Sequence, residues 1–302
     1  MAMGPVPPEP NWWELGHLFL NDSSPLVVPL TTGPFHAGRA WRVCSGKSGD
    51  SILIKERADS DRAREHARLA WQLASNPEWA RHPWLPTMIR TGSPFFTVQD
   101  RIYQAWSWME GEPISEDALD LALGLRQLGL LSEISVTAFG TREGPLPCVV
   151  TREQAIGGWL GAPMDFSEGL EQRVSRFLKE WAPRALAQVR RLPRRGELQV
   201  CHGDPWSGNW LRLTGPIGQT AYGLIDWSTA RWDHTASDRA RLIGSTGQVV
   251  RTGAADGDIP QTLAWTGLLA GLCNWMEKRK QGLWTEAGRG RVLWILRRLG
   301  EA

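Results

Sequence analysis

The sequence predicts an α+β fold in two parts, a strand-rich part over residues 1–110 and a mainly helical part over residues 111–302. In the first part, short apolar and β-branched runs alternate with turn-forming residues, which predicts an antiparallel sheet. In the second part, Leu-rich and Ala-rich segments at helical spacing predict a helical lobe. A chain of 302 residues is long enough to give two such lobes an ample core.

The first part begins with Met1–Pro10, a Pro-rich stretch that predicts a loose tail. The turn-rich segment Gly46–Asp50 separates two apolar runs and predicts a hairpin. A helix follows, because small apolar residues recur at helical spacing, and two more strands close this part. The predicted elements are strands at Ala40–Val43, Ser51–Lys55, Phe95–Gln99 and Arg101–Trp108, with a helix at Asp59–Ser75.

In the second part, helical periodicity surrounds a short strand-rich segment near residue 200. Ser115 and Asp117 are helix-start residues for the first helix, and Val136–Pro147 is expected to be a long connection. The predicted helical segments are Ser115–Leu131, Phe166–Leu192 (one or two helices), Thr262–Gln281 and Ala287–Leu299.

The most informative segment is CHGDPWSGN at Cys201–Asn209, followed by GLIDW at Gly223–Trp227. Short apolar strands are expected on either side, so that Asp204 and Asn209 share a polar loop and Asp226 ends a strand. Phosphoryl transfer needs one carboxylate that orients and deprotonates a hydroxyl, and an amide and a carboxylate that hold magnesium. A lone Asp at a strand end is often only a turn former, so the prediction depends on the combination.

This combination, HGDxxxxN followed by IDW, resembles the aminoglycoside phosphotransferase and choline kinase superfamily, small-molecule kinases of the protein-kinase-like fold. The resemblance implies a protein-kinase-like two-lobed fold with ATP between the lobes. By position it implies that Asp204 is the catalytic base and that Asn209 and Asp226 are magnesium ligands. It implies a structural role for His202, and for Asp238 in a segment similar to the DPxxDLA element of the family.

The resemblance also implies nucleotide-binding residues in the first part. Lys55 would hold the α- and β-phosphates, and Glu65 on the following helix would pair with Lys55, although Glu56 and other acids compete for this role. The phosphate-covering loop is expected between residues 30 and 41, where Gly33 and Gly38 occur without a GxGxxG motif.

The segment Trp106–Pro113 resembles the hinge of the family, whose backbone contacts the adenine edge. Trp108 and Met109 are the candidates for this contact, and an ordinary exit from a strand into a turn is equally compatible with the local sequence.

The expected function is ATP- and Mg²⁺-dependent phosphorylation of a hydroxyl on a sugar, amino sugar, amino alcohol or hydroxy amino acid. Acidic and basic residues are mixed near the motif, which favours a neutral or weakly cationic acceptor, with Trp206 and Asp233 as substrate contacts. The alternatives are an aminoglycoside-type antibiotic phosphotransferase and a non-catalytic nucleotide-binding regulator of the same fold. HRD, DFG and APE elements are absent from the sequence, which disfavours a protein kinase.

The composition of the chain restricts which partners it can bind and in which cellular compartment it is expected. A net charge of +2 with both signs interspersed argues against a dedicated nucleic-acid surface, and no apolar run is long enough to predict a membrane span. The four cysteines have no metal-site spacing, so reduced thiols in the cytoplasm are expected. The 18 tryptophans are expected mainly to pack in the core. The oligomeric state is left open.

Overall fold

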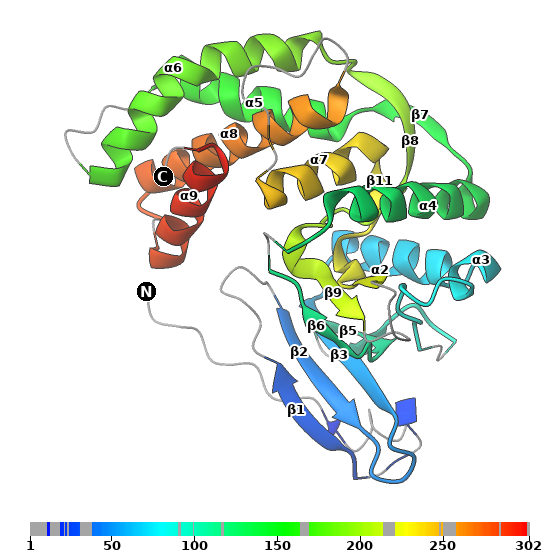
Figure 1. The fold of residues 1–302 in the computed structure, drawn as a ribbon. Helices are drawn as coiled ribbons and strands as arrows, with labels where there is room; N and C mark the ends of the chain where they lie inside the picture. The colour runs from blue at the N-terminus through cyan, green and yellow to red at the C-terminus, as the bar shows by residue number, and fades with distance from the viewer. Residues whose placement is uncertain are drawn as a thin grey trace. The chain divides into compact units, whose positions relative to one another are not determined.

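The computed structural model describes residues 11–12, 19–20, 22, 24–30, 38–89, 92–98, 100–115, 118–163, 169–213, 221–247, 249, 258–283 and 285–300. The chain divides into two compact units, Met1–Glu110 and Gly111–Ala302, whose helices and strands are labelled in Figure 1. Among the described residues no helix combines the length and apolar character needed to cross a membrane.

The first unit is built on a five-stranded antiparallel sheet with the order β1-β2-β3-β5-β4. This sheet and the mainly helical second unit confirm the predicted α+β, protein-kinase-like fold class. The strands are β1 Leu26–Leu30, β2 Gly38–Cys44, β3 Ser51–Ala58, β4 Phe96–Val98 and β5 Arg101–Ser107, and the helices are α2 Asp61–Ala74 and α3 Pro77–Ala80.

The alternation of side chains along β3 places Lys55 and Glu56 on opposite faces of the sheet. Lys55 pairs in register with Gln104, two residues from Ile102 on β5, so the side chains of these three residues share a face. Helix α2 covers this face, because its residues Ala63 and Ala67 cluster with Ile102. The fold therefore directs Lys55 to the side of the sheet on which α2 packs.

Glu56 lies on the other face and is only 2% exposed. Its carboxylate accepts two hydrogen bonds from Arg39, at 3.1 Å from Nε and 2.6 Å from Nη2, and one from the Tyr103 hydroxyl at 2.9 Å. Arg101 lies 3.8 Å away. Burial, reinforced by the Glu56 carboxylate, raises the pKa of Tyr103 to about 12. A buried acid at this position is stable only because arginines neutralise it.

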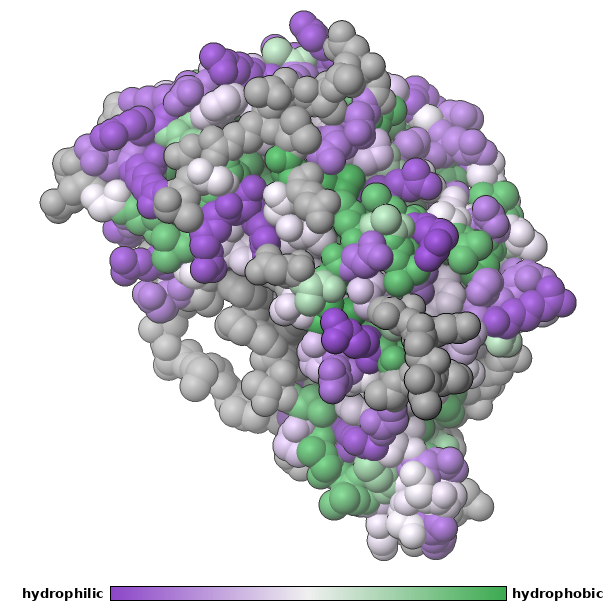
Figure 2. Space-filling view, in the orientation of Figure 1, coloured by the Kyte–Doolittle hydropathy of each residue, from purple (hydrophilic) through white to green (hydrophobic). Residues whose placement is uncertain are grey.

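The second unit is a set of long helices with two small sheets. Helices α5, α6, α8 and α9 bury a common hydrophobic cluster that includes Trp159, Leu178 and Trp265. Hydrophilic side chains gather over the outer side of α6, as Figure 2 shows along its upper left edge, in keeping with an amphipathic helix. The helices are α4 Leu121–Phe139, α5 Pro147–Gly161, α6 Gly169–Arg191, α7 Thr235–Thr246, α8 Ile259–Lys280 and α9 Glu286–Arg298.

The first helix of this unit differs from the sequence prediction. It begins after Asp120, whose side chain accepts a hydrogen bond from the Leu123 N–H, and it ends at Gly140 with a φ of +68°. The predicted connection Val136–Pro147 therefore contains the last turn of α4 as well as a strand, β7, at Arg142–Pro145. That strand forms only because it pairs with β8, far along the chain, and such pairing leaves no local signal in the sequence.

The two small sheets have the strand orders β10-β9-β6 and β11-β8-β7, and they support the loops that contain the predicted site. The chain leaves β8 into residues 202–209, called the Asp204 loop, and leaves β10 into residues 225–230, called the Asp226 loop. The strands are β6 Gly111–Pro113, β8 Arg195–Cys201, β9 Trp210–Leu213, β10 Ala221–Leu224 and β11 Arg231–Asp233.

Helix α7 holds the start of the Asp204 loop through Asp238. Its carboxylate accepts hydrogen bonds from the backbone N–H groups of His202 at 2.8 Å and Gly203 at 2.9 Å. Burial raises the pKa of Asp238 to about 6, against the opposing effects of Arg231 and the two backbone donors. One carboxylate thus fixes two successive peptide groups of the loop.

Gly203 is required at its position for two reasons. Its φ is +87°, which side chains of L-residues rarely permit, and a Cβ there would overlap the carbonyl oxygen of Thr229. The hydroxyl of Thr229 donates to the His202 carbonyl oxygen at 3.1 Å, and Arg231 donates to the Gly203 carbonyl oxygen at 2.8 Å. The two loops are therefore in direct backbone contact.

The hydrogen bonds of Glu56 with Arg39 and Tyr103 lead to a first prediction, which concerns the stability of the fold. Glu56→Ala leaves Arg39 and Tyr103 without their shared acceptor, so the free energy of unfolding should fall by about 2–4 kcal/mol. Glu65→Ala is the matched control, because Glu65 is exposed on α2 and its replacement should change stability by less than about 0.5 kcal/mol. Denaturant unfolding of the two full-length variants measures the difference, and equal effects would contradict the assignment.

A second prediction concerns Asp238 and pH. Because its folded pKa of about 6 lies above the ordinary 3.8, the folded chain binds this proton more tightly than the unfolded chain. The contribution of Asp238 to stability should therefore fall as pH rises from about 4 to about 6, by on the order of 1–3 kcal/mol, and then stay constant.

Asp238→Asn has no titrating group at this site and supplies the reference. The difference in unfolding free energy between wild type and Asp238→Asn, measured from pH 4.5 to 7.5, should decrease with rising pH up to about pH 6. A difference that grows with pH over this range would show that the folded protein instead favours the ionised carboxylate.

Candidate functional site

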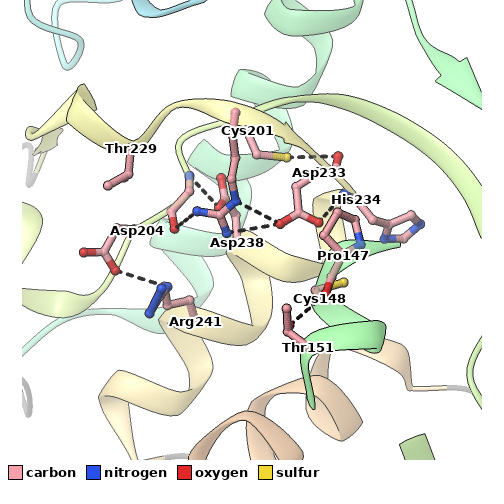
Figure 3. Close-up of polar contacts among 12 residues, drawn as sticks. Pro147, Cys148, Thr151, Cys201, Asp204, Thr229, Asp233, His234, Asp238 and Arg241 are labelled. Carbon is pink, nitrogen blue, oxygen red and sulfur yellow. Dashed lines mark hydrogen bonds and ion pairs between the residues drawn. The ribbon is translucent and has the colours of Figure 1, made fainter. Parts of the chain in front are cut away.

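Asp204 presents a partly exposed carboxylate from the loop between β8 and β9. Its side chain is 31% exposed, and Oδ1 lies 3.1 Å from Nε of Arg241 on α7. Figure 3 marks this ion pair with a dashed line. The backbone N–H of Asp204 donates to Nδ1 of His202 at 3.2 Å. The backbone of Asp204 is thus fixed by buried groups while its carboxylate stays accessible.

His202 connects the two loops from a fully buried position. Its Nε2 lies 2.9 Å from the carbonyl oxygen of Ile225, and its ring meets that of Trp227 edge-on, with centroids 4.5 Å apart. Because Nδ1 accepts a hydrogen bond from the Asp204 N–H, these contacts assign the proton to Nε2. A neutral His202 therefore links the backbone of Asp204 to the residue that precedes Asp226.

Asn209 is buried and makes a second connection between the loops. Its side-chain nitrogen donates to the carbonyl oxygen of Asp204 at 2.8 Å, and its own backbone carbonyl accepts from the Ile225 N–H at 2.9 Å. The side-chain nitrogen is committed to the protein, so the amide oxygen is the atom that can bind a cation.

Asp226 has a left-handed backbone, with φ 66° and ψ 62°, and is the one non-glycine residue with positive φ in the part of the chain that the structure describes. Asp tolerates this conformation better than most residues, but it still carries strain, and such strain concentrates at functional sites. Its Oδ1 accepts from the Ser228 hydroxyl at 2.6 Å.

These donors fit magnesium. Asn209 and Asp226 offer an amide and a carboxylate oxygen on two loops that hydrogen bonds join, and Mg²⁺ prefers hard oxygen ligands with only one or two carboxylates beside phosphates. Over the described ranges no group of three or more His, Cys, Asp or Glu side chains could hold a metal ion. Mg²⁺ bound by Asn209 and Asp226 would therefore need phosphate and water oxygens as its other ligands.

Two expected substrate contacts have different surroundings. Asp233 is 1% exposed, and its carboxylate accepts from Arg231 at 3.1 and 3.2 Å and from the His234 N–H at 2.8 Å. The structure thus gives Asp233 a buried, structural role instead of the predicted substrate contact. Trp206 is half-buried, and its indole lies so close over Gly208 that a Cβ there would overlap the ring.

The predicted nucleotide-binding residues lie in the first unit, apart from Gly33, which is outside the described residues. Lys55 is half-buried in β3 and Gly38 begins β2. Trp108 and Met109 follow β5, and the Trp108 N–H donates to the Ser51 carbonyl oxygen at 3.2 Å.

Glu65 lies on α2 and is exposed, whereas its neighbours His66 and Ala67 are buried. Its pairing with Lys55 stays a prediction.

Sequence reasoning missed the specific roles of Arg231 and Arg241, which it considered only as charges that offset nearby acids. Arg231 binds both the Gly203 carbonyl oxygen and the Asp233 carboxylate, and Arg241 pairs with Asp204. One signal was available for Arg241. Arg241 follows Asp238 by three residues on α7, and residues at this spacing lie on the same face of a helix. Because Asp238 faces the Asp204 loop, Arg241 faces it as well.

Comparisons with solved structures show the fold. An aminoglycoside phosphotransferase from Alicyclobacillus acidocaldarius matches with a TM-score of 0.65 at 15% identity, over 99% of this chain and 95% of that one. A spectinomycin phosphotransferase, solved with ADP and spectinomycin, gives 0.57 at 12%, over 94% and 91%. An ethanolamine kinase from Plasmodium vivax gives 0.53 at 14%, over 92% and 82%.

At these identities the likeness is one of fold, and fold alone does not fix a substrate. A search of curated proteins gives no match. The family model of the phosphotransferase enzyme family matches residues 39–268, which include Lys55, both loops of the site and α7. On this match the chain belongs to the phosphotransferase enzyme family.

Proposed function

We propose that the protein is an ATP- and Mg²⁺-dependent phosphotransferase that phosphorylates a hydroxyl of a small metabolite, a sugar, amino sugar, amino alcohol or hydroxy amino acid. The observation that carries the proposal is the joined pair of loops. His202 and Asn209 connect the backbone of Asp204 to that of Ile225, immediately before Asp226. An accessible carboxylate and two oxygen donors for a cation are thereby held in one rigid arrangement.

In this proposal Asp204 orients the acceptor hydroxyl and takes its proton while the hydroxyl oxygen attacks the γ-phosphorus and ADP leaves. Asn209 and Asp226 hold Mg²⁺, which neutralises charge on the phosphates. Asp238 and His202 keep the loop in place and contact neither substrate. Positioning and charge neutralisation supply most of the catalysis in such reactions.

The first unit would bind the nucleotide. We assign Lys55 to the α- and β-phosphates, because it lies on the α2 side of β3 and an ammonium group binds phosphate as a point charge. Gly33 and Gly38 remain proposed phosphate-loop residues, and the backbone at Trp108 and Met109 remains the proposed adenine contact. Trp206, fixed over Gly208, remains the proposed aromatic contact of the acceptor.

Two alternatives can be separated from this proposal. An enzyme for polycationic antibiotics needs carboxylates around the acceptor, but the described side chain paired with Asp204 is an arginine. A non-catalytic nucleotide-binding regulator would bind the nucleotide without turnover. It is disfavoured because the residues proposed as base and cation ligands are all present, and hydrogen bonds hold Asn209 and Asp226.

Nucleotide binding is the first test. Saturating ATP or ADP with Mg²⁺ should raise the melting temperature, since a ligand at 100 times its Kd that binds only the folded state adds about 2.7 kcal/mol of stability. EDTA should reduce the shift if Asn209 and Asp226 bind through the metal. An unchanged melting temperature with ATP, ADP and GTP would count against the proposal.

Substitution of the two aspartates should separate their roles. Asp204→Asn should lower turnover at least about 10²-fold with little change in nucleotide affinity, because it removes the base. Asp226→Asn should weaken Mg²⁺-dependent nucleotide binding as well as turnover. Asp100→Asn is the control, because its side chain is 84% exposed in a turn and it should behave as wild type. Substantial turnover by Asp204→Asn would refute the assigned mechanism.

A further inference from the structure

Arg241 occupies an unusual position for a structural residue. Its guanidinium pairs with the carboxylate to which the acceptor hydroxyl must donate, 3.1 Å from Oδ1. The side chain of Arg241 is 46% exposed and that of Asp204 is 31% exposed, so water screens this ion pair and it contributes little to stability. An accessible guanidinium beside the base is therefore better explained by ligand binding than by folding.

A second guanidinium, that of Arg291, interacts electrostatically with Arg241 and Asp204. Arg291 on α9 stacks on Trp294, with its central carbon 4.1 Å from the ring centroid. Burial lowers its pKa, repulsion by Arg241 lowers it further, and attraction by Asp204 raises it. Because arginine stays protonated in proteins, the charges of two cations, Arg241 and Arg291, act on the Asp204 carboxylate.

The two cations restrict the acceptor. A cationic acceptor would be repelled by Arg241 and Arg291, and a neutral acceptor would gain no attraction from either charge. A carboxylate offers the planar, two-oxygen geometry that guanidinium binds best. An acceptor carboxylate bound to Arg241 would bring its neighbouring hydroxyl close to Asp204.

We propose that the acceptor is a hydroxy acid, and that Arg241 binds its carboxylate while the neighbouring hydroxyl meets Asp204. This inference rests on the proposed function and narrows the acceptor to hydroxylated carboxylates such as sugar acids and hydroxy amino acids. The step is balanced: the hydroxyl proton passes to Asp204, the oxygen–phosphorus bond forms, and ADP departs with the electrons of the bond that breaks. Arg241 forms no covalent bond and sets specificity.

The test uses matched acceptors and the full chain. ADP release with MgATP is measured for gluconate against gluconamide, glycerate against glycerol, and homoserine against homoserinol. At least one carboxylate should exceed its uncharged or cationic partner in kcat/KM by tenfold or more. Arg241→Gln should remove this preference mainly through a higher KM for the carboxylate, and Arg241→Lys should restore part of it.

Arg239→Gln is the matched control. It removes an arginine from the same helix, but Arg239 points towards Gly129 on α4, 3.9 Å from the position of a Cβ there. This variant should keep the carboxylate preference. A loss of activity by Arg241→Gln towards charged and uncharged acceptors alike would show a structural role and overturn the inference.

The remaining outcomes separate the inference from the proposed function. If MgATP stabilises the protein but no carboxylate of the panel is preferred, the inference fails and the phosphotransferase proposal stands. If MgATP neither binds nor is turned over, the proposed function fails and the inference falls with it. A preference for the cationic homoserinol would overturn the inference directly.

Discussion

The candidate site depends on the two hydrogen bonds from the Asp204 loop to the carboxylate of Asp238. Without an acceptor for the N–H groups of His202 and Gly203, the loop would bury two unpaired donors beside the Thr229 carbonyl oxygen. Such groups cost about 1–3 kcal/mol each when left unpaired. Asp238 is itself unfavourable to bury, as its raised pKa shows, and Arg231 offsets part of that cost.

Hydrogen bonds on either side of Asp204 extend this fixed backbone conformation through the rest of the Asp204 loop. His202 is fixed at its N–H by Asp238 and at its ring by the Ile225 carbonyl oxygen and Trp227. Asn209 repeats the connection on the other side of Asp204. The side chains proposed to act on substrate and metal are therefore oriented by backbone contacts, which leaves their functional oxygens available.

Tryptophan supports the same arrangement, which helps to explain its abundance in the chain. The indole N–H of Trp210 donates to the Pro205 carbonyl oxygen at 3.2 Å, and that of Trp227 donates to the Leu224 carbonyl oxygen at 3.0 Å. Both rings are fully buried. Each one fills the core below a loop and donates a hydrogen bond to a carbonyl group at the loop boundary.

The sequence by itself determined the α+β fold class, most of the elements and the residues of both loops, because strand and helix periodicity and the CHGDPWSGN and GLIDW segments are local features. Tertiary structure decided what depends on distant pairing or on the rotation of a helix. It extended α4, formed β7 against β8, turned Glu65 to solvent, buried Asp233 with Arg231 and placed Arg241 on Asp204. The spacing of residues in the sequence shows which side chains can share one face of a helix or strand. Which other residues contact that face depends on packing across the whole unit.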